Sequence, residues 1–224
     1  MKITVLTGAG VSAESGLGTF RDKDGLWTKY DLEEVATPQG FARNPGLVHD
    51  FYNARRANCM QAMPNAAHDA LARLEEVSAH NVTLITQNVD DLHERAGSQT
   101  VIHMHGALMQ ATCAVCRATW AAPLTMAPDD LCPDCAAPAT RPDIVWFGEV
   151  PYHMDQIAEA VSNADLFVAI GTSAEVYPAA GLVELAQGRT LEINLAPSAQ
   201  ANAFEDHLIG PATKVVPNWV AGLL

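Results

Sequence analysis

Four short apolar runs constrain the fold of this 224-residue chain more than any other feature of its sequence. Each run is apolar and contains β-branched residues, which favours a buried strand, and each ends in glycine, amide or hydroxyl residues. The runs cover residues 2–7, 82–86, 166–170 and 190–193, and they are followed by Gly8, Gln87, Gly171 and Asn194. Continuous apolar strands separated by helical stretches indicate a parallel sheet that is covered on both faces.

The residues that follow these runs predict where a ligand binds. In open sheets of parallel strands, ligands lie beyond the carboxyl ends of the strands, which is where these small and polar residues fall. Helical spacing is present at residues 45–60, 66–77, 154–162 and 179–187, with Asn65 as a cap for the second segment. We expect these helices to cover the sheet.

Two Cys-x-x-Cys pairs give the strongest local signal in the chain. Cys113, Cys116, Cys132 and Cys135 have the spacing that places four thiolates around a tetrahedral zinc ion. Four thiolates leave no position open for water, so the metal is expected to be structural. Redox pairs or unliganded thiols are the alternatives. The segment from Cys113 to Pro142 lacks periodicity and is predicted to be a small inserted module that the metal holds together.

The first strand runs directly into Gly8-Ala-Gly-Val-Ser-Ala13, which fits the G-x-G-x-x-G/A pattern. In that pattern the missing side chains let backbone N–H groups approach a pyrophosphate. A glycine turn at a strand end is the alternative. A dehydrogenase would carry a second strand within about 30 residues, ending in an acid for the adenosine ribose. Since the next clear run begins only at Val82, a hydride-transfer enzyme is disfavoured.

Several further motifs resemble those of the sirtuins, and they occur in sirtuin order from Thr4 to Pro217. They are Gly8-Ala-Gly-Val-Ser12 with Gly16, Thr19-Phe-Arg-Asp22, Thr86-Gln-Asn-Val-Asp90 with Leu92-His93, His103-Met-His-Gly106, Phe147-Gly-Glu149 and Gly171-Thr-Ser173. Sirtuins consume NAD to remove acyl groups from lysine side chains. The resemblance therefore implies an α/β fold with a Rossmann-like, doubly wound parallel sheet and a small inserted zinc-ribbon and helical domain.

The resemblance also implies a division of the chain. Residues 1–27, 78–106 and 143–224 would form the Rossmann-like NAD-binding domain. Residues 28–77 would form the helical module of the small domain, and residues 107–142 its zinc-binding module.

The NAD-binding residues implied by the resemblance surround the strand ends. Asp90 can accept a hydrogen bond from a carboxamide, and Asn88 can orient a ribose hydroxyl, roles that suit their side chains. The complete expected set is Gly8, Ala9, Gly10, Ser12, Ala13, Glu14, Thr19, Phe20, Arg21, Trp27, Gln87, Asn88, Asp90, Gly171, Thr172, Ser173, Asn194, Leu195 and Ala212.

Two histidines, His103 and His105, are candidates for the general base. His103 and His105 lie in a predicted strand at residues 101–105, where alternation puts them on one face and Met104 on the other. An imidazole with a pKa near ~6.5 accepts protons at neutral pH, and the residues alone leave both histidines open. The Met-His-Gly position of His105 resembles that of the sirtuin base, which makes His105, Asn88 and Asp90 the expected catalytic residues.

The reaction that the resemblance implies begins with attack of the acyl-lysine carbonyl oxygen on the ribose carbon that carries nicotinamide. Nicotinamide leaves, and His105 deprotonates a ribose hydroxyl that takes over the acyl group. The expected products are free lysine, nicotinamide and O-acyl-ADP-ribose.

Acyl selection is expected from Tyr52 and Arg55, which lie three residues apart in a predicted helix. A guanidinium can bind a carboxylate bidentately, and a phenol can add a hydrogen bond. The pair resembles that of the sirtuin class that accepts succinyl and malonyl lysine, whereas Arg56 should point elsewhere. The alternative is an amphipathic helix with a half-buried tyrosine and a solvated arginine.

A substrate-binding stretch is expected at Phe147, Gly148 and Glu149. In sirtuins, the stretch they resemble pairs with the substrate backbone as an added strand. Because backbone pairing makes few demands on side chains, a broad range of protein substrates is expected.

Composition limits the partners. The chain has 13 Lys and Arg against 26 Asp and Glu, a formal charge of −13, which argues against nucleic acid as a partner. No apolar run approaches the ~20 residues of a membrane span, and the N-terminus lacks signal-peptide features. Four of five cysteines sit in pairs, which is consistent with a reducing compartment. We expect a cytoplasmic, monomeric enzyme without membrane contact, acting on acylated protein lysines.

Two other functions fit an NAD pocket. An ADP-ribosyltransferase would transfer ADP-ribose to a protein side chain. A non-catalytic NAD-sensing protein would bind NAD without releasing nicotinamide, although the presence of His105, Asn88 and Asp90 together argues against it.

Overall fold

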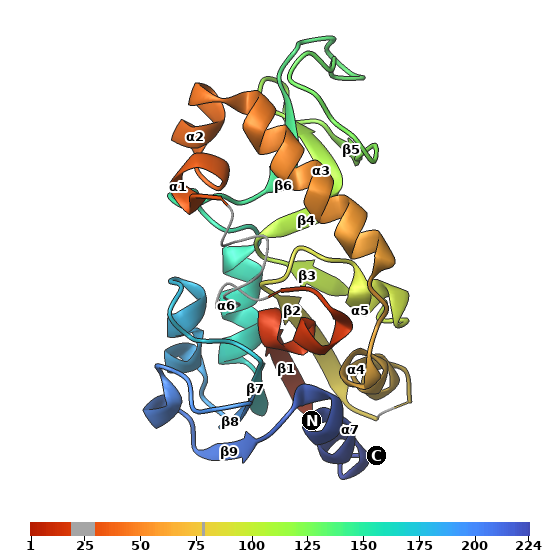
Figure 1. Cartoon of the computed structure of the whole chain (residues 1–224). Helices are drawn as coiled ribbons and strands as arrows, with labels where there is room; N and C mark the ends of the chain where they lie inside the picture. Colours follow the sequence, from red (N-terminus) through yellow and green to blue (C-terminus); the bar gives the residue numbers. More distant parts are fainter. Residues whose placement is uncertain (19–29, 78) are drawn as a thin grey trace.

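The computed structural model describes residues 1–18, 30–77 and 79–224 (Figure 1). In these residues a six-stranded sheet has the order β3-β2-β1-β7-β8-β9, and all neighbouring strands run parallel. The strands are β1 Lys2–Thr7, β2 Asn81–Thr86, β3 Val101–His103, β7 Leu166–Ile170, β8 Arg189–Asn194 and β9 Asp206–Ile209. This is the doubly wound order, whose direction reverses between β1 and β7. The predicted α/β fold is confirmed.

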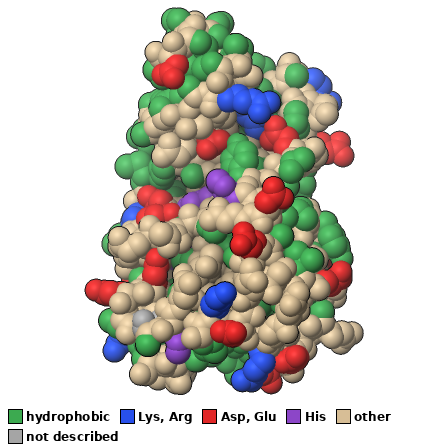
Figure 2. All heavy atoms as spheres, turned by 180° about the vertical axis from the view of Figure 1, so that it is seen from behind, with side chains coloured by type: hydrophobic (Ala, Val, Ile, Leu, Met, Phe, Trp, Pro, Cys, Tyr) green, Lys and Arg blue, Asp and Glu red, His purple; other side chains and the backbone are tan. Residues whose placement is uncertain are grey.

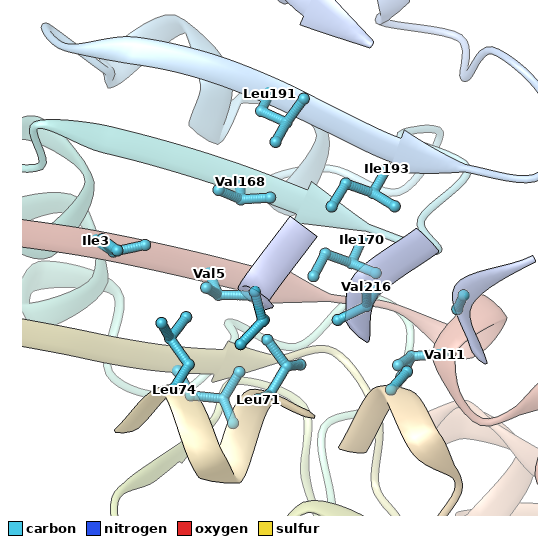
Figure 3. Packing of buried hydrophobic residues seen from close by; sticks show 14 residues of the cluster. Ile3, Val5, Val11, Leu71, Leu74, Val168, Ile170, Leu191, Ile193 and Val216 are labelled. Atoms are coloured by element: carbon cyan, nitrogen blue, oxygen red, sulfur yellow. The ribbon is translucent and has the colours of Figure 1, made fainter. Parts of the chain in front are cut away.

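Helices cover both faces of this sheet because the strand residues alternate between two apolar clusters. Ile3 and Val5 of β1 pack against α4 (Ala66–Val77) and α7 (Ala212–Ala221), as Figure 3 shows for part of this cluster. Leu6 points the other way, toward α6 (Met154–Ser162) and the 3₁₀ helix η4 (Ala179–Leu185). Both faces are therefore buried, as the apolar strands require.

Two of the predicted helices, at residues 66–77 and 154–162, have the observed bounds, and the helix predicted at 45–60 extends to Gln61. The α-helix predicted at residues 179–187 is wrong, because this segment is a 3₁₀ helix that ends at Leu185. Gly181 lies in its centre, and glycine destabilises a helix interior. Neither β9 nor α7 was predicted from the sequence, and the periodicity of α7 is interrupted by Pro217.

In the part of the chain that the structure describes, the smaller part of the molecule joins three helices to a three-stranded antiparallel sheet of order β5-β4-β6. The helices are α1 Leu32–Val35, α2 Pro38–Arg43 and α3 Pro45–Gln61, and the strands are β4 Gly106–Cys113, β5 Thr119–Ala121 and β6 Thr140–Ile144. Phe51 and Tyr52 of α3 pack with Leu108 and Trp146 into one buried cluster. The small sheet thus reaches slightly beyond both ends of the zinc module expected at 107–142.

Helix α3 starts where local sequence dictates. Pro45 occupies its first turn, and the Oδ1 of Asn44 accepts a hydrogen bond from the Leu47 N–H at 3.1 Å. None of the described helices is long and apolar enough to cross a membrane. Acidic side chains are scattered over the face of the molecule seen in Figure 2 and form no single patch there.

Candidate active site

A cavity of about 1240 Å³ lies where the carboxyl ends of the large sheet face the smaller part of the molecule. It is larger than the ~300–1,000 Å³ of an ordinary small-molecule pocket, so a dinucleotide and a second substrate fit together. The described residues predicted for the site all line it, namely Gly8, Ala9, Gly10, Ser12, Ala13, Glu14, Tyr52, Arg55, Gln87, Asn88, Asp90, His105, Phe147, Gly148, Glu149, Gly171, Thr172, Ser173, Asn194, Leu195 and Ala212. The predicted Thr19, Phe20, Arg21 and Trp27 lie outside the described residues.

The glycine-rich loop lies at the switch point of the sheet and packs directly on the loop after β7. A Cβ on Gly8 would lie 2.8 Å from the carbonyl oxygen of Gly171, and one on Gly10 would lie 2.7 Å from the Gly171 Cα. The Gly10 N–H donates to the Gly171 carbonyl at 2.8 Å. Close packing between the two loops therefore requires these glycines, in addition to any contact with a phosphate.

We expect Gly10→Ala to lower the free energy of unfolding by about 1–3 kcal/mol, because the added methyl meets backbone that cannot move aside cheaply. The affinity for NAD should fall as well, since the loop is displaced. Denaturant unfolding and calorimetric NAD titration measure the two effects.

The matched control is Gly46→Ala in the first turn of α3, where the new Cβ would meet only Asn44 Oδ1 at 3.7 Å. This variant should be unchanged or slightly more stable. Equal stability of the two variants would contradict the packing argument.

Several predicted NAD ligands also hold the cavity walls together. Gln87 Nε2 donates to Thr172 Oγ1 at 3.0 Å, and Asn194 Nδ2 donates to the Thr172 carbonyl at 2.7 Å. The Glu14 carboxylate accepts hydrogen bonds from the N–H and hydroxyl of Thr213 at the start of α7. These side chains thus fix the loops that follow β1, β2, β7 and β8.

The two candidate bases have different surroundings. His103 is engaged at both nitrogens, by the Asn88 carbonyl at 3.2 Å and by Glu94 at 2.6 Å. Burial lowers the pKa of His103, but the Glu94 carboxylate outweighs this effect and raises it. His103 is also absent from the cavity lining. His103 is therefore held by protein contacts at both ring nitrogens and does not line the cavity.

His105 lines the cavity, just beyond the end of β3. Its Nδ1 lies 3.1 Å from the Gln87 carbonyl, which can only accept, so the proton sits on Nδ1 and Nε2 is left as an acceptor. Burial lowers the pKa of His105, against the opposing effect of the Gln87 hydrogen bond. A neutral imidazole with a fixed tautomer is suited to accept a proton.

Asn88 and Asp90 are buried and line the same cavity as His105. Asn88 Nδ2 donates to the Gly8 carbonyl at 3.2 Å and to Ser12 Oγ at 3.1 Å, which fixes the orientation of the amide. Burial raises the pKa of Asp90, while hydrogen bonds from the Leu92 N–H and from Ser12 oppose that rise. His68 is buried, and its Nε2 lies 3.4 Å from Ser12 Oγ.

Tyr52 and Arg55, the pair expected to select the acyl group, lie together on α3. The Arg55 guanidinium carbon lies 5.5 Å from the centre of the Tyr52 ring, and both residues line the cavity. Arg56 is 1% exposed and points away, toward the zinc module, where its guanidinium donates to the carbonyls of Leu124 and Leu108. Burial lowers the pKa of Arg56 to about 10.

The stretch expected to bind substrate backbone has an exposed Phe147, whose N–H donates to the Ala36 carbonyl. The Glu149 side chain is engaged within the protein, since both of its oxygens accept hydrogen bonds from Arg141, at 2.7 and 2.9 Å. Its carboxylate therefore supports the stretch from inside. Trp146, which precedes the predicted motif and lines the cavity, was not identified from the sequence.

The four cysteines of the paired motifs meet at one point, with their sulfur atoms all within 4.8 Å of one another. Cys113 and Cys135 Sγ lie 3.7 Å apart, and Cys116 and Cys132 Sγ lie 3.6 Å apart. Sulfurs around a zinc ion at about 2.3 Å are separated by about 3.8 Å, so the set fits tetrahedral Zn²⁺ and does not fit disulfides. The site is closed and structural, as predicted.

The fold and the site together define a dinucleotide-binding α/β protein whose inserted module is held by a four-thiolate metal site. Comparison with known proteins narrows this class. The model of the Sir2 family matches residues 8–178. The chain belongs to the Sir2 family.

Individual relatives agree with this assignment. An NAD-dependent protein deacylase of Caulobacter vibrioides is 63% identical over 100% of this chain and 97% of its own length. One of Bdellovibrio bacteriovorus is 51% identical over 99% and 96%. Among solved structures, a Sir2 homologue in complex with ADP-ribose superposes with a TM-score of 0.91 at 42% identity, covering 99% of this chain and 91% of that one. A Sir2 homologue in complex with NAD gives 0.90 at 42% identity, covering 99% and 88%.

Proposed function

We propose that this protein removes acyl groups from protein lysine side chains with NAD and one water as co-substrates, giving free lysine, nicotinamide and O-acyl-ADP-ribose. The observation that carries this proposal is the arrangement of His105. Its Nε2 is left as an acceptor in a cavity of about 1240 Å³ that Asn88 and Asp90 also line. Membership of the Sir2 family supports the same chemistry.

Each of these residues has a role that follows from its contacts. When bound, NAD supplies a ribose carbon with nicotinamide as the leaving group. Asn88, whose Nδ2 is committed to Gly8 and Ser12, presents its Oδ1 as an acceptor for a ribose hydroxyl. Asp90 accepts from the carboxamide of nicotinamide. His105 Nε2 takes the proton of the hydroxyl that receives the acyl group.

Within this reaction we propose that Tyr52 and Arg55 select acyl groups that end in a carboxylate, such as succinyl and malonyl. Both side chains line the cavity from α3, and the guanidinium lies against the rings of Phe51 and Tyr52. A cation held in a mostly apolar wall favours a carboxylate over a neutral methyl group. The same pocket also accepts the smaller acetyl group.

The test is mass spectrometry of one lysine peptide, prepared with a succinyl or an acetyl group and incubated with the protein and NAD. The proposal predicts NAD-dependent loss of the acyl group and formation of the matching O-acyl-ADP-ribose. ADP-ribosylated peptide would instead indicate a transferase, and NAD binding without nicotinamide release would indicate a sensor.

Arg55→Met is expected to lower kcat/KM for the succinyl peptide by about 10- to 100-fold, the effect of losing a hydrogen bond to a charged group. Activity on the acetyl peptide should change little. Steady-state rates on the two peptides measure the selectivity. Arg73→Met, which alters an exposed arginine on α4, is the matched control. An equal loss on both peptides would contradict the role in acyl selection.

We also propose that the protein is a cytoplasmic monomer and that the chain divides at the domain limits given above. Reduced thiolates around zinc support a reducing compartment. The two sheets, with separate apolar clusters, support the division.

A further inference from the structure

We propose that Trp146 is a positioning residue for acyl selection, because its indole N–H directs the hydroxyl proton of Tyr52 into the acyl pocket. This inference rests on the proposed preference for acyl groups that end in a carboxylate. The Trp146 side chain acts on the substrate through its hydrogen bond to Tyr52.

The contact between the two residues has a defined direction. Trp146 Nε1 lies 3.0 Å from the Tyr52 hydroxyl oxygen, and an indole N–H can only donate. Tyr52 is 1% exposed and Trp146 is 2% exposed, so water cannot replace this bond without rearrangement. The Tyr52 oxygen therefore serves as the acceptor, and its own proton must point elsewhere.

The groups around the Tyr52 hydroxyl leave the cavity as the direction for its proton. A guanidinium has no acceptor, so the neighbouring Arg55 cannot receive it. Both the Trp146 indole and the Arg55 guanidinium donate hydrogen bonds to the Tyr52 hydroxyl, and within residues 1–18, 30–77 and 79–224 no protein acceptor is found for its proton. Burial raises the pKa of Tyr52 despite the opposing Arg55 charge, so the hydroxyl keeps its proton at neutral pH. A carboxylate in the pocket thus meets a donor from Tyr52 beside the cation of Arg55.

Trp146 is itself held rigidly. The Arg141 guanidinium carbon lies 3.5 Å from the centre of its ring, and Phe41 packs at 5.1 Å between ring centres. Glu149 binds Arg141 and also accepts the Trp146 backbone N–H at 2.8 Å. The stretch expected to bind the substrate backbone is thereby connected to the residue that orients the acyl pocket.

The test compares Trp146→Phe with Tyr52→Phe and with the double variant, using succinyl and acetyl forms of one peptide. Trp146→Phe keeps an aromatic ring and removes the N–H. We expect a loss of about tenfold in kcat/KM for the succinyl peptide, the effect of one misdirected hydrogen bond, with little change for the acetyl peptide. In the Tyr52→Phe background, adding Trp146→Phe should have no further effect on selectivity.

Other outcomes are equally decisive. Additive losses in the double variant, or equal losses on both peptides, would mean that Trp146 acts only in packing, and the inference would be wrong. If Trp146→Phe does not fold, site-specific incorporation of 3-benzothienylalanine, which keeps the shape of the indole and replaces its N–H by sulfur, provides a second variant, and it should lose the succinyl preference. If the wild-type protein removes only acetyl groups, the proposed acyl preference fails, which is a result distinct from failure of the Trp146 inference.

Discussion

His105→Ala is expected to lower kcat for deacylation by about 10²- to 10⁴-fold, the contribution of a positioned general base. The Gln87 carbonyl holds the proton of His105 on Nδ1, so Nε2 is left ready to accept a proton. NAD binding should persist, because the loops around the cavity are held by other contacts. Single-turnover measurements of peptide and NAD products check both points.

The pH profile provides an independent check. Burial lowers the pKa of His105 below its ordinary value of 6.5. The active form is the neutral imidazole, so activity should be complete above that ordinary value and should fall only as the pH drops through the lowered pKa. An acid limb above pH 6.5 would contradict the assignment.

His103→Gln is the matched control for the base. His103 is tied to Glu94 and to the Asn88 carbonyl, and it does not line the cavity. We expect its replacement to cost less than about tenfold, the effect of a lost hydrogen bond in a supporting contact. A larger loss in this variant than in His105→Ala would reverse the two roles.

Removal of zinc is expected to unfold the smaller part of the molecule and to abolish activity, although the metal lies outside the cavity lining. Structural zinc sites contribute about 10–16 kcal/mol of apparent binding energy, more than the module's small apolar core can replace. Arg56 and Asn53 of α3 bind carbonyls at Leu124 and Met126 in this module, so its loss also releases the helix that carries Tyr52 and Arg55.

The measurement is a thermal unfolding scan with zinc analysis, before and after chelation, and again after zinc is restored. Cys132→Ser should behave like the chelated protein. Cys59→Ala is the control, because Cys59 packs in the apolar cluster of α3 and is not one of the four clustered sulfurs, so its replacement should leave the zinc content unchanged. Retention of the unfolding temperature after complete zinc loss would contradict a structural role.

Gly8 and Gly10 show which features of the loop can be predicted from the local sequence and which cannot. The sequence predicts a phosphate-binding loop at Gly8 and Gly10, and the loop indeed lies at the switch point of the sheet. It does not show that both glycines are required by contact with Gly171, a residue far away in the chain. An α-helix was likewise predicted at residues 179–187, because over a few residues the apolar spacing of this segment is similar to that of an α-helix. The segment is instead the 3₁₀ helix η4.

By itself, the sequence determined the parallel sheet and the metal site, because both depend on short-range features: continuous apolar strands and the fixed spacing of paired cysteines. Only the tertiary structure distinguishes the surroundings of His103 and His105, since alternation along the strand places both on one face. Their hydrogen-bond partners, at residues 87, 88 and 94, come from other segments. The direction of the Tyr52 hydroxyl was likewise decided by Trp146, which is 94 residues away, because a hydrogen bond depends on distances that exist only after the chain has folded.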